Sequence, residues 1–476
     1  MSNKTKELAR NTVIVTIGKI CTQFLNFFLL PVFTSLLTTE QYGTADLYLN
    51  YVNLFIPVLT LQLDMGLFRF LIDVREKPQE QGRLMTSALL CCAIQSMICI
   101  GLYLLSTLFL SDVNLLYLLL NLIAAGAVAM LQQAARGLGD NMGFAVSSLI
   151  AAAVQIGVNV VLICGFGWRT EAMFLAYFCG CACCVLFLSI RLKLPRYISR
   201  KYISKAKQRE MLAYSIPLVP NSMCWWAVSA ADRTIVSLAL GTAANGLLAI
   251  SHKFASVYTM GINIFVYPWT ESASLYFSEP DHDAFFSSVI NTMFRLFYSL
   301  CIGIIATIPF VFSFIVDEQF SYAYFQIPLF LFGGLLNTIV GLYSVVFQAA
   351  KRTRYIAITS IIAAVISVVV DISLIGFIGL YAPAVASLCS YGIFALIRYR
   401  EARKYICAPL EKKVVILGLL VSALVLTGYY TENLRIQIAG FAAALAFAII
   451  VNLGVLKSKL KRKLKPTSKT LKKGDQ

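Results

Sequence analysis

Ionisable side chains inside long apolar segments are the residues of this sequence best able to do chemistry. A charge at the centre of a bilayer costs about 3 kcal/mol or more, so such a side chain is expected to face protein or water. Several of them stand well inside stretches long enough to cross a membrane. The basic ones are Lys19, Arg69, Arg233, Lys253 and Arg295, and the acidic ones are Asp64, Asp232, Glu271 and Asp371.

The five basic residues predict a cavity that binds an anionic group. Arginine binds phosphate through paired hydrogen bonds, and lysine binds it as a point charge. A cavity for organic cations would require the opposite sign. An alternative stays open, in which these bases pair with buried carboxylates to pin helices together or to close a gate. Asp64 and Glu271 are the candidates for that gate or ion-pair role.

A second group of side chains has the chemistry of a site for a coupling ion. Ser367 and Asp371 are four residues apart, which places them on one face of a helix. Asp232 and Ser387 stand on two other apolar segments. Carboxylate and hydroxyl oxygens suit Na⁺, and a buried carboxyl group is equally able to carry H⁺. We therefore expect Na⁺ or H⁺ coupling and no other cofactor. The alternative is that Asp371 bonds to a neighbouring helix.

Composition predicts the elements that position these residues. The chain has 476 residues, of which 59% are hydrophobic and 13% charged, and its mean hydropathy is +0.77. Soluble domains carry about 25% charged residues, so this chain belongs in a bilayer. We predict an all-α polytopic membrane protein with fourteen spans, at about 12–37, 46–71, 84–110, 113–135, 144–166, 171–190, 212–239, 247–271, 286–312, 322–348, 355–378, 381–398, 413–430 and 434–456.

The distribution of charge predicts the orientation of the chain. The net charge is +17. With the N-terminus inside, the inner segments hold 33 of the 40 Lys and Arg residues, the outer loops hold 2, and 5 stand within spans. A missed span would invert every later loop, so this bias supports the count and places both ends in the cytoplasm. It also explains the basic excess without nucleic acid as a partner.

An internal repeat predicts two halves. Gln133-Ala134-Ala135-Arg136 follows the fourth span, and Gln348-Ala349-Ala350-Lys351 follows the tenth. An even number of spans separates the copies, so both point the same way, as in other transporters with parallel repeats. The expected organisation is an N-terminal six-helix lobe at 1–190, a basic cytoplasmic linker at 191–211, a C-terminal six-helix lobe at 212–400, two further spans at 401–456 and a basic cytoplasmic tail at 457–476.

Several motifs resemble those of bacterial polysaccharide flippases of the O-antigen, capsule and teichuronic type. Glu40-Gln41-Tyr42-Gly43 is similar to an acidic-x-Tyr-Gly turn of that family, and Asp232-Arg233-Thr234-Ile235-Val236 and Gln348-Ala349-Ala350-Lys351-Arg352-Thr353 also match. Gly379 to Ser387 resembles a further family stretch, with Ala382-Pro383 where Gly-Ala is usual. The family belongs to the MOP flippase superfamily, with the MATE multidrug exporters and the lipid II flippase. The resemblance implies two six-helix lobes around a cavity that opens alternately to each side.

Together these features predict a non-enzymatic flippase of the bacterial cytoplasmic (inner) membrane for undecaprenyl-pyrophosphate-linked oligosaccharide. The sequence has no Gly-rich phosphate loop with its lysine, and none of the predicted outer loops is long enough to carry a catalytic domain. The lipid II flippase, which the chain resembles, binds Na⁺ between the corresponding three helices. A lipid II-type flippase and a MATE-like multidrug antiporter remain alternatives. Expected partners are the lipid-linked glycan, anionic lipids near the tail, and polysaccharide polymerase or assembly proteins.

Overall fold

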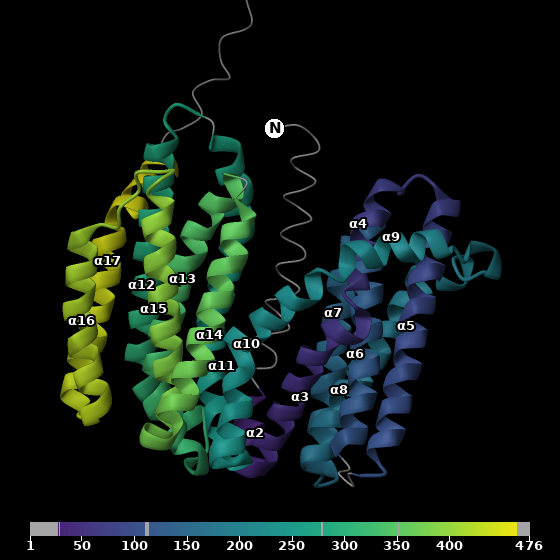
Figure 1. The fold of residues 1–476 in the computed structure, drawn as a ribbon. Coiled ribbons are helices and arrows are strands. Elements are labelled where there is room, and N and C mark those ends of the chain that lie inside the picture. Colours follow the sequence, from purple (N-terminus) through teal and green to yellow (C-terminus); the bar gives the residue numbers. More distant parts are fainter. Residues whose placement is uncertain (1–26, 28, 110–113, 278, 351, 464–476) are drawn as a thin grey trace, which may run out of the picture. The chain divides into compact units, whose positions relative to one another are not determined.

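The computed structural model describes residues 27, 29–109, 114–277, 279–350 and 352–463. Within these ranges every regular element is a helix, and no strand occurs (Figure 1). The predicted class, an all-α polytopic membrane protein, is confirmed. A bilayer offers backbone groups no water to bond with, so helices that satisfy them internally are the expected answer to this composition.

The first half of the chain forms a series of long apolar helices. Figure 1 shows α5 to α8 running side by side. A break at Leu61 and Gln62, both in the left-handed conformation, bends α3 against α4 by 54°. The helices are α2 (Leu30–Leu36), α3 (Thr39–Thr60), α4 (Leu63–Asp73), α5 (Pro78–Ser106), α6 (Asn114–Gly137), α7 (Asn141–Val160), continued by the π-helix η1 (Val161–Gly165), and α8 (Thr170–Arg191).

The second half of the chain is also helical and ends in α16 and α17. Two short 3₁₀ helices, η2 (Leu194–Arg196) and η3 (Arg200–Tyr202), connect the halves. They are followed by α9 (Lys205–Ser215), α10 (Leu218–Leu240), α11 (Thr242–Tyr276), α12 (His282–Ile315), η4 (Glu318–Gln326), α13 (Ile327–Ala349), α14 (Thr353–Ile378), η5 (Gly379–Tyr381), α15 (Ala382–Ala402), α16 (Lys412–Thr431) and α17 (Leu434–Lys463).

The helices agree with the predicted spans. In the described part of the chain, nine helices are long and apolar enough to cross a membrane, and ten if the bent pair α3 and α4 counts as one span. The first predicted span lies mostly outside the described residues. The thirteen later ones each coincide with a helix or, for 46–71, with the bent pair. The protein is therefore a multi-pass membrane protein.

Two compact units make up the described chain. Unit 1 comprises the residues up to Lys253 together with Phe314–Gln326 and Ser360–Ser390, and unit 2 comprises Phe254–Ser313, Ile327–Thr359 and the residues from Tyr391 on. The boundaries between these units pass through α11, α12, α14 and α15, within helices, and so do not test the lobes that the repeat predicts. The predicted lobe boundaries stay a prediction.

The segment predicted as a linker is part of unit 1 and packs on its helices. Its helix α9 buries Met211 in a core cluster with leucines of α4. Gly66 of α4 approaches Ser215 so closely that an added Cβ would lie 2.3 Å from the Ser215 hydroxyl oxygen. Thr86 of α5 donates a hydrogen bond to the carbonyl oxygen of Tyr197. The basic segment thus packs on the ends of α4 and α5.

Candidate functional site

One face of α3 provides the frame of the candidate site. Thr38 caps the helix in a reciprocal pair of hydrogen bonds with Gln41. Thr39, Gly43, Asp46 and Asn50 then follow at spacings of four, three and four residues, so they share one face. We call these four residues the α3 stripe. Each of them contacts α10 or α11 within unit 1.

The outer contacts of the stripe depend on two glycines. A Cβ added to Gly43 would lie 1.9 Å from the Thr242 carbonyl oxygen, and one added to Gly246 would lie 2.0 Å from the Thr39 carbonyl oxygen. The side chain of Asn245 donates a hydrogen bond of 2.8 Å to the Gly43 carbonyl oxygen. Because any side chain would separate the backbones, glycine at both positions permits this close crossing of α3 and α11.

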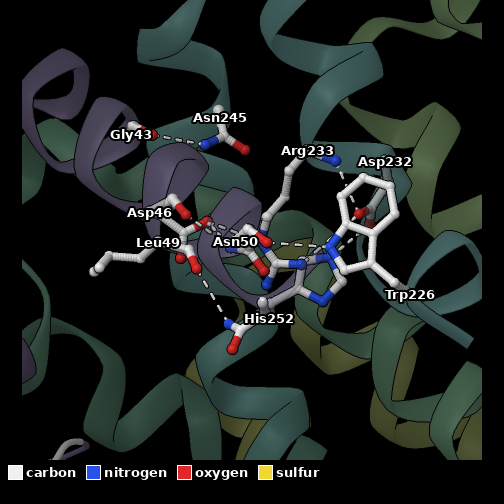
Figure 2. A network of polar contacts seen from close by, with 10 residues as sticks. Gly43, Asp46, Leu49, Asn50, Trp226, Asp232, Arg233, Asn245 and His252 are labelled. Atoms are coloured by element: carbon white, nitrogen blue, oxygen red, sulfur yellow. Dashed lines mark hydrogen bonds and ion pairs between the residues drawn. The ribbon is translucent and has the colours of Figure 1, made fainter. Parts of the chain in front are cut away.

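The next contact along the stripe is an ion pair between Asp46 and Arg233 of α10. Arg233 Nε lies 2.8 Å from Asp46 Oδ2, and the side chains are 13% and 14% exposed (Figure 2). The Asn50 amide donates to the same carboxylate oxygen over 3.1 Å. Trp226 of α10 donates from its ring nitrogen to the Asn50 carbonyl oxygen over 3.2 Å. Asp46 is thus held from its own helix and from α10.

A second carboxylate, Asp232, lies beside this pair. It accepts a hydrogen bond of 2.9 Å from the backbone N–H of Arg233. Its other oxygen lies 2.7 Å from Nε2 of His252 on α11. Lys253 follows His252 and lies within electrostatic range of Asp46. Asp46, Asp232, Arg233, His252 and Lys253, which we call the charged cluster, therefore bring three helices of unit 1 together.

Further bonds of unit 1 connect α2 to the last residue of α12 and to the segment that follows it. Gln319 of η4 donates from its amide to the carbonyl oxygens of Thr34 and Leu37, over 2.7 and 3.0 Å. The Thr34 hydroxyl donates to the Ile315 carbonyl oxygen and accepts from the Asp317 backbone N–H, each over 3.3 Å. These contacts join segments about 280 residues apart in the sequence.

The residues predicted to hold a coupling ion also lie in unit 1. Asp371 of α14 is 2% exposed, and neither of its carboxylate oxygens has a hydrogen-bond partner among the described residues. Asp232 lies within electrostatic range of it. Ser367 and Ser387 are half-buried on α14 and α15. A buried carboxylate with two unpaired oxygens fits a cation or a proton, since burying it alone is costly.

The other predicted basic residues lie elsewhere. Lys19 falls outside the described residues. Arg69 is half exposed and forms an ion pair of 2.7 Å with Asp73, one turn along α4. Arg295 belongs to unit 2, where it pairs with Glu411 in the segment before α16. Within unit 1 the described structure thus brings together Arg233 and Lys253, with Arg69 outside the charged cluster.

Of the two residues predicted for a gate or an ion pair, Asp64 and Glu271, the structure describes the side chain of Asp64. Asp64 is 7% exposed at the start of α4, directly after the break. It accepts a hydrogen bond of 3.3 Å from the Thr60 hydroxyl, and no ion pair of Asp64 occurs among the described residues. The side chain of Glu271 is not described. The gate assignment therefore stays a prediction.

Sequence reasoning missed Asp46, Asn50, Trp226 and His252 as members of the site. Asp46 is the first residue of a predicted span, and a charged residue at that position is readily assigned to the preceding loop. The available signal was the helical spacing of Gly43, Asp46 and Asn50, which follows the capping residues of α3. That spacing becomes visible only when the helix is extended back to Thr39.

Residues 8–272 match a protein family described as polysaccharide biosynthesis protein, which is more than half of the chain. The chain belongs to this family. A comparison with curated protein sequences gives no match. The predicted resemblance to a polysaccharide family is confirmed at the level of this polysaccharide biosynthesis family.

Solved structures similar to this family member share its fold. An inward-facing multidrug resistance MATE transporter of the MOP superfamily is 13% identical, with a TM-score of 0.68 over 80% of this chain and 94% of that one. An outward-facing MATE transporter is 14% identical, with a TM-score of 0.61 over 85% and 96%. The lipid II flippase MurJ, in an inward closed conformation, is 14% identical, with a TM-score of 0.67 over 93% and 100%.

Proposed function

We propose that this protein moves an undecaprenyl-pyrophosphate-linked oligosaccharide across the bacterial cytoplasmic membrane by alternating access, without catalysis. The observation that carries the proposal is the family match over residues 8–272 in a chain with the fold of the MOP superfamily. The bias of Lys and Arg toward one set of loops supports a cytoplasmic location for both termini.

In this proposal the lipid tail stays in the bilayer while the charged head group and sugars pass through the protein. The pyrophosphate requires cationic partners on the way, because its charge is costly to move through an apolar interior. Arg233 on α10 and Lys253 on α11 are two predicted bases that lie within electrostatic range of each other in unit 1. Lys19, Arg69 and Arg295 are proposed as further phosphate contacts along the route.

A coupled ion gradient would drive the cycle in one direction. We propose that Asp232 and Asp371 hold Na⁺ or H⁺, assisted by Ser367 and Ser387. Asp371 supports this role best, because it is buried and its carboxylate oxygens lack partners among the described residues. Asp64 and Glu271 are proposed to stabilise gates. Anionic lipids at the basic tail, and polymerase or assembly proteins, are the proposed partners.

A lipid II-type peptidoglycan precursor is the second candidate substrate. The likeness to MurJ favours it, because all of that chain is covered. The two substrates share a polyprenyl pyrophosphate, so the bases of the cavity serve either one. Complementation of strains that lack one or the other flippase separates the two candidates.

Variants of the bases test the proposal. In sealed proteoliposomes, Arg233→Ala and Arg295→Ala are expected to abolish leaflet exchange of a pyrophosphate-linked polyprenyl oligosaccharide. Size-exclusion profiles and melting temperatures establish that each variant is folded. Arg83→Ala is the matched control, because Arg83 is half exposed and pairs only locally with Glu80. Full exchange by both folded variants contradicts the assignment of these bases.

A further inference from the structure

The guanidinium of Arg233 is already bonded to an anion in this structure. Arg233 Nε donates to a carboxylate oxygen of Asp46 over 2.8 Å. Carboxylate and phosphate oxygens are the same class of acceptor for arginine, and both are bound through charge-assisted hydrogen bonds. If Arg233 binds the pyrophosphate, as the proposed function has it, Asp46 and the substrate compete for the same guanidinium group.

Asp46 also lies where α3 contacts α10, close to the crossing of α3 with α11. It belongs to the α3 stripe, one turn from the close crossing of Gly43 with α11. The other members of the stripe contact α10 and α11 through backbone atoms, of Thr39, Gly43 and Asn50. Asp46 alone in the stripe uses a charged side chain, so its contact is the one that an anion can replace.

We propose that Asp46 is a built-in competitor of the substrate, which the phosphoryl group of the incoming lipid displaces from Arg233. This inference rests on the proposed function. Displacement breaks the ion pair between α3 and α10 and so loosens the α3 stripe. Binding of an anionic head group thereby promotes the separation of α3 from α10 and α11 that exposure to the other side requires.

The geometry permits the exchange. Both side chains of the pair keep some exposed surface, at 13% and 14%. The displaced Asp46 keeps the amide of Asn50 as a donor, which lies on its own helix. Lys253 places a further amine near the Arg233 site. A doubly charged phosphoryl group gains more from Arg233 and Lys253 than a single carboxylate does.

The test measures binding of farnesyl pyrophosphate to the purified full-length protein by isothermal titration calorimetry. Asp46→Asn removes the competitor while conserving shape, and Asp46→Ser does so with a smaller side chain. If the pair is intact in about nine molecules of ten, its removal tightens binding about tenfold. Glu80→Gln is the control, because it makes the same change of charge at an exposed local pair.

Further binding measurements show which part of the ligand supplies the affinity and whether Arg233 is required. Farnesol lacks the phosphate and is expected not to bind, and inorganic pyrophosphate reports how much affinity the phosphate alone supplies. Asp46→Asn combined with Arg233→Gln is expected to lose the gain. In the wild type, farnesyl pyrophosphate is expected to speed hydrogen exchange in residues 39–50.

Each outcome has a distinct meaning. If both Asp46 variants bind no more tightly than Glu80→Gln while the wild type binds through Arg233, the competition is refuted and the proposed function stands. Unchanged exchange in residues 39–50 on binding also overturns the inference. If the wild type does not bind farnesyl pyrophosphate, or binds it without need of Arg233, the proposed function fails first.

Discussion

Replacing Gly43 by alanine is expected to separate α3 from α11. The added Cβ would lie 1.9 Å from the Thr242 carbonyl oxygen and 2.6 Å from the Gly246 backbone nitrogen. Side-chain carbons essentially never approach closer than 3.0 Å, so the two backbones have to move apart by at least about 1 Å. Neither contact atom belongs to a side chain that could turn away.

The expected size of the effect follows from the cost of overpacking. Such insertions typically cost about 1–3 kcal/mol. Because about 1.4 kcal/mol is a factor of ten in an equilibrium constant, the closed contact becomes about 5- to 150-fold less populated relative to the open one. The Asn245 hydrogen bond to the Gly43 carbonyl oxygen is lost with it.

Hydrogen exchange measured by mass spectrometry tests this directly. Residues 39–47 and 242–250 are expected to exchange faster in Gly43→Ala than in the wild type. Gly101→Ala is the matched control, because a Cβ at Gly101 meets nothing within 4 Å and the change of helix propensity is the same. Equal exchange in the variant and the wild type would refute the close crossing as a constraint.

Three further predictions concern stability, measured as the thermal melting midpoint. The hydrogen bond from Arg191 lowers the pKa of the Asp140 carboxyl group. The ionised carboxylate therefore stabilises the fold at pH values above the unfolded pKa of about 3.9. Because the pair is partly exposed, its contribution is about 1 kcal/mol or less. Asp140→Asn is expected to lower the midpoint at pH 7, and the difference should vanish as the pH falls below 4. Arg398→Ala is expected to cost about 2–4 kcal/mol, because this fully buried side chain makes two hydrogen bonds, whereas Arg398→Met should recover most of the packing. Gly418→Leu is expected to destabilise α16 against α12, since a Cβ there would lie 2.2 Å from the Tyr298 ring, and Tyr298→Ala should relieve the clash.

The helices were predictable because the bilayer imposes a simple rule on composition. A run of about 20 apolar residues is long enough to cross the bilayer as a helix. The bias of Lys and Arg toward one set of loops then checks the number of predicted spans. The glycine of Tyr42-Gly43 recurs in Asn245-Gly246, at corresponding places of the predicted repeat. In the structure these two dipeptides meet each other.

The partners of the charges were not predictable in the same way. Sequence spacing identifies which residues share a helix face, but not which face of another helix they meet. Arg233 pairs with its neighbour Asp232, as a pairing of bases with buried carboxylates allows, but its shorter bond is to Asp46, 187 positions away. Arg295 likewise pairs with Glu411, from a segment between the last apolar helices. Such pairs depend on the packing of helices distant in sequence.

The transport assay in sealed proteoliposomes tests the central claim most directly. It follows leaflet exchange of a pyrophosphate-linked polyprenyl oligosaccharide, with a fluorescent organic cation measured in parallel. The account predicts exchange of the lipid without movement of the cation. Movement of the cation with no exchange of the lipid would contradict it and would assign this family member to cation export.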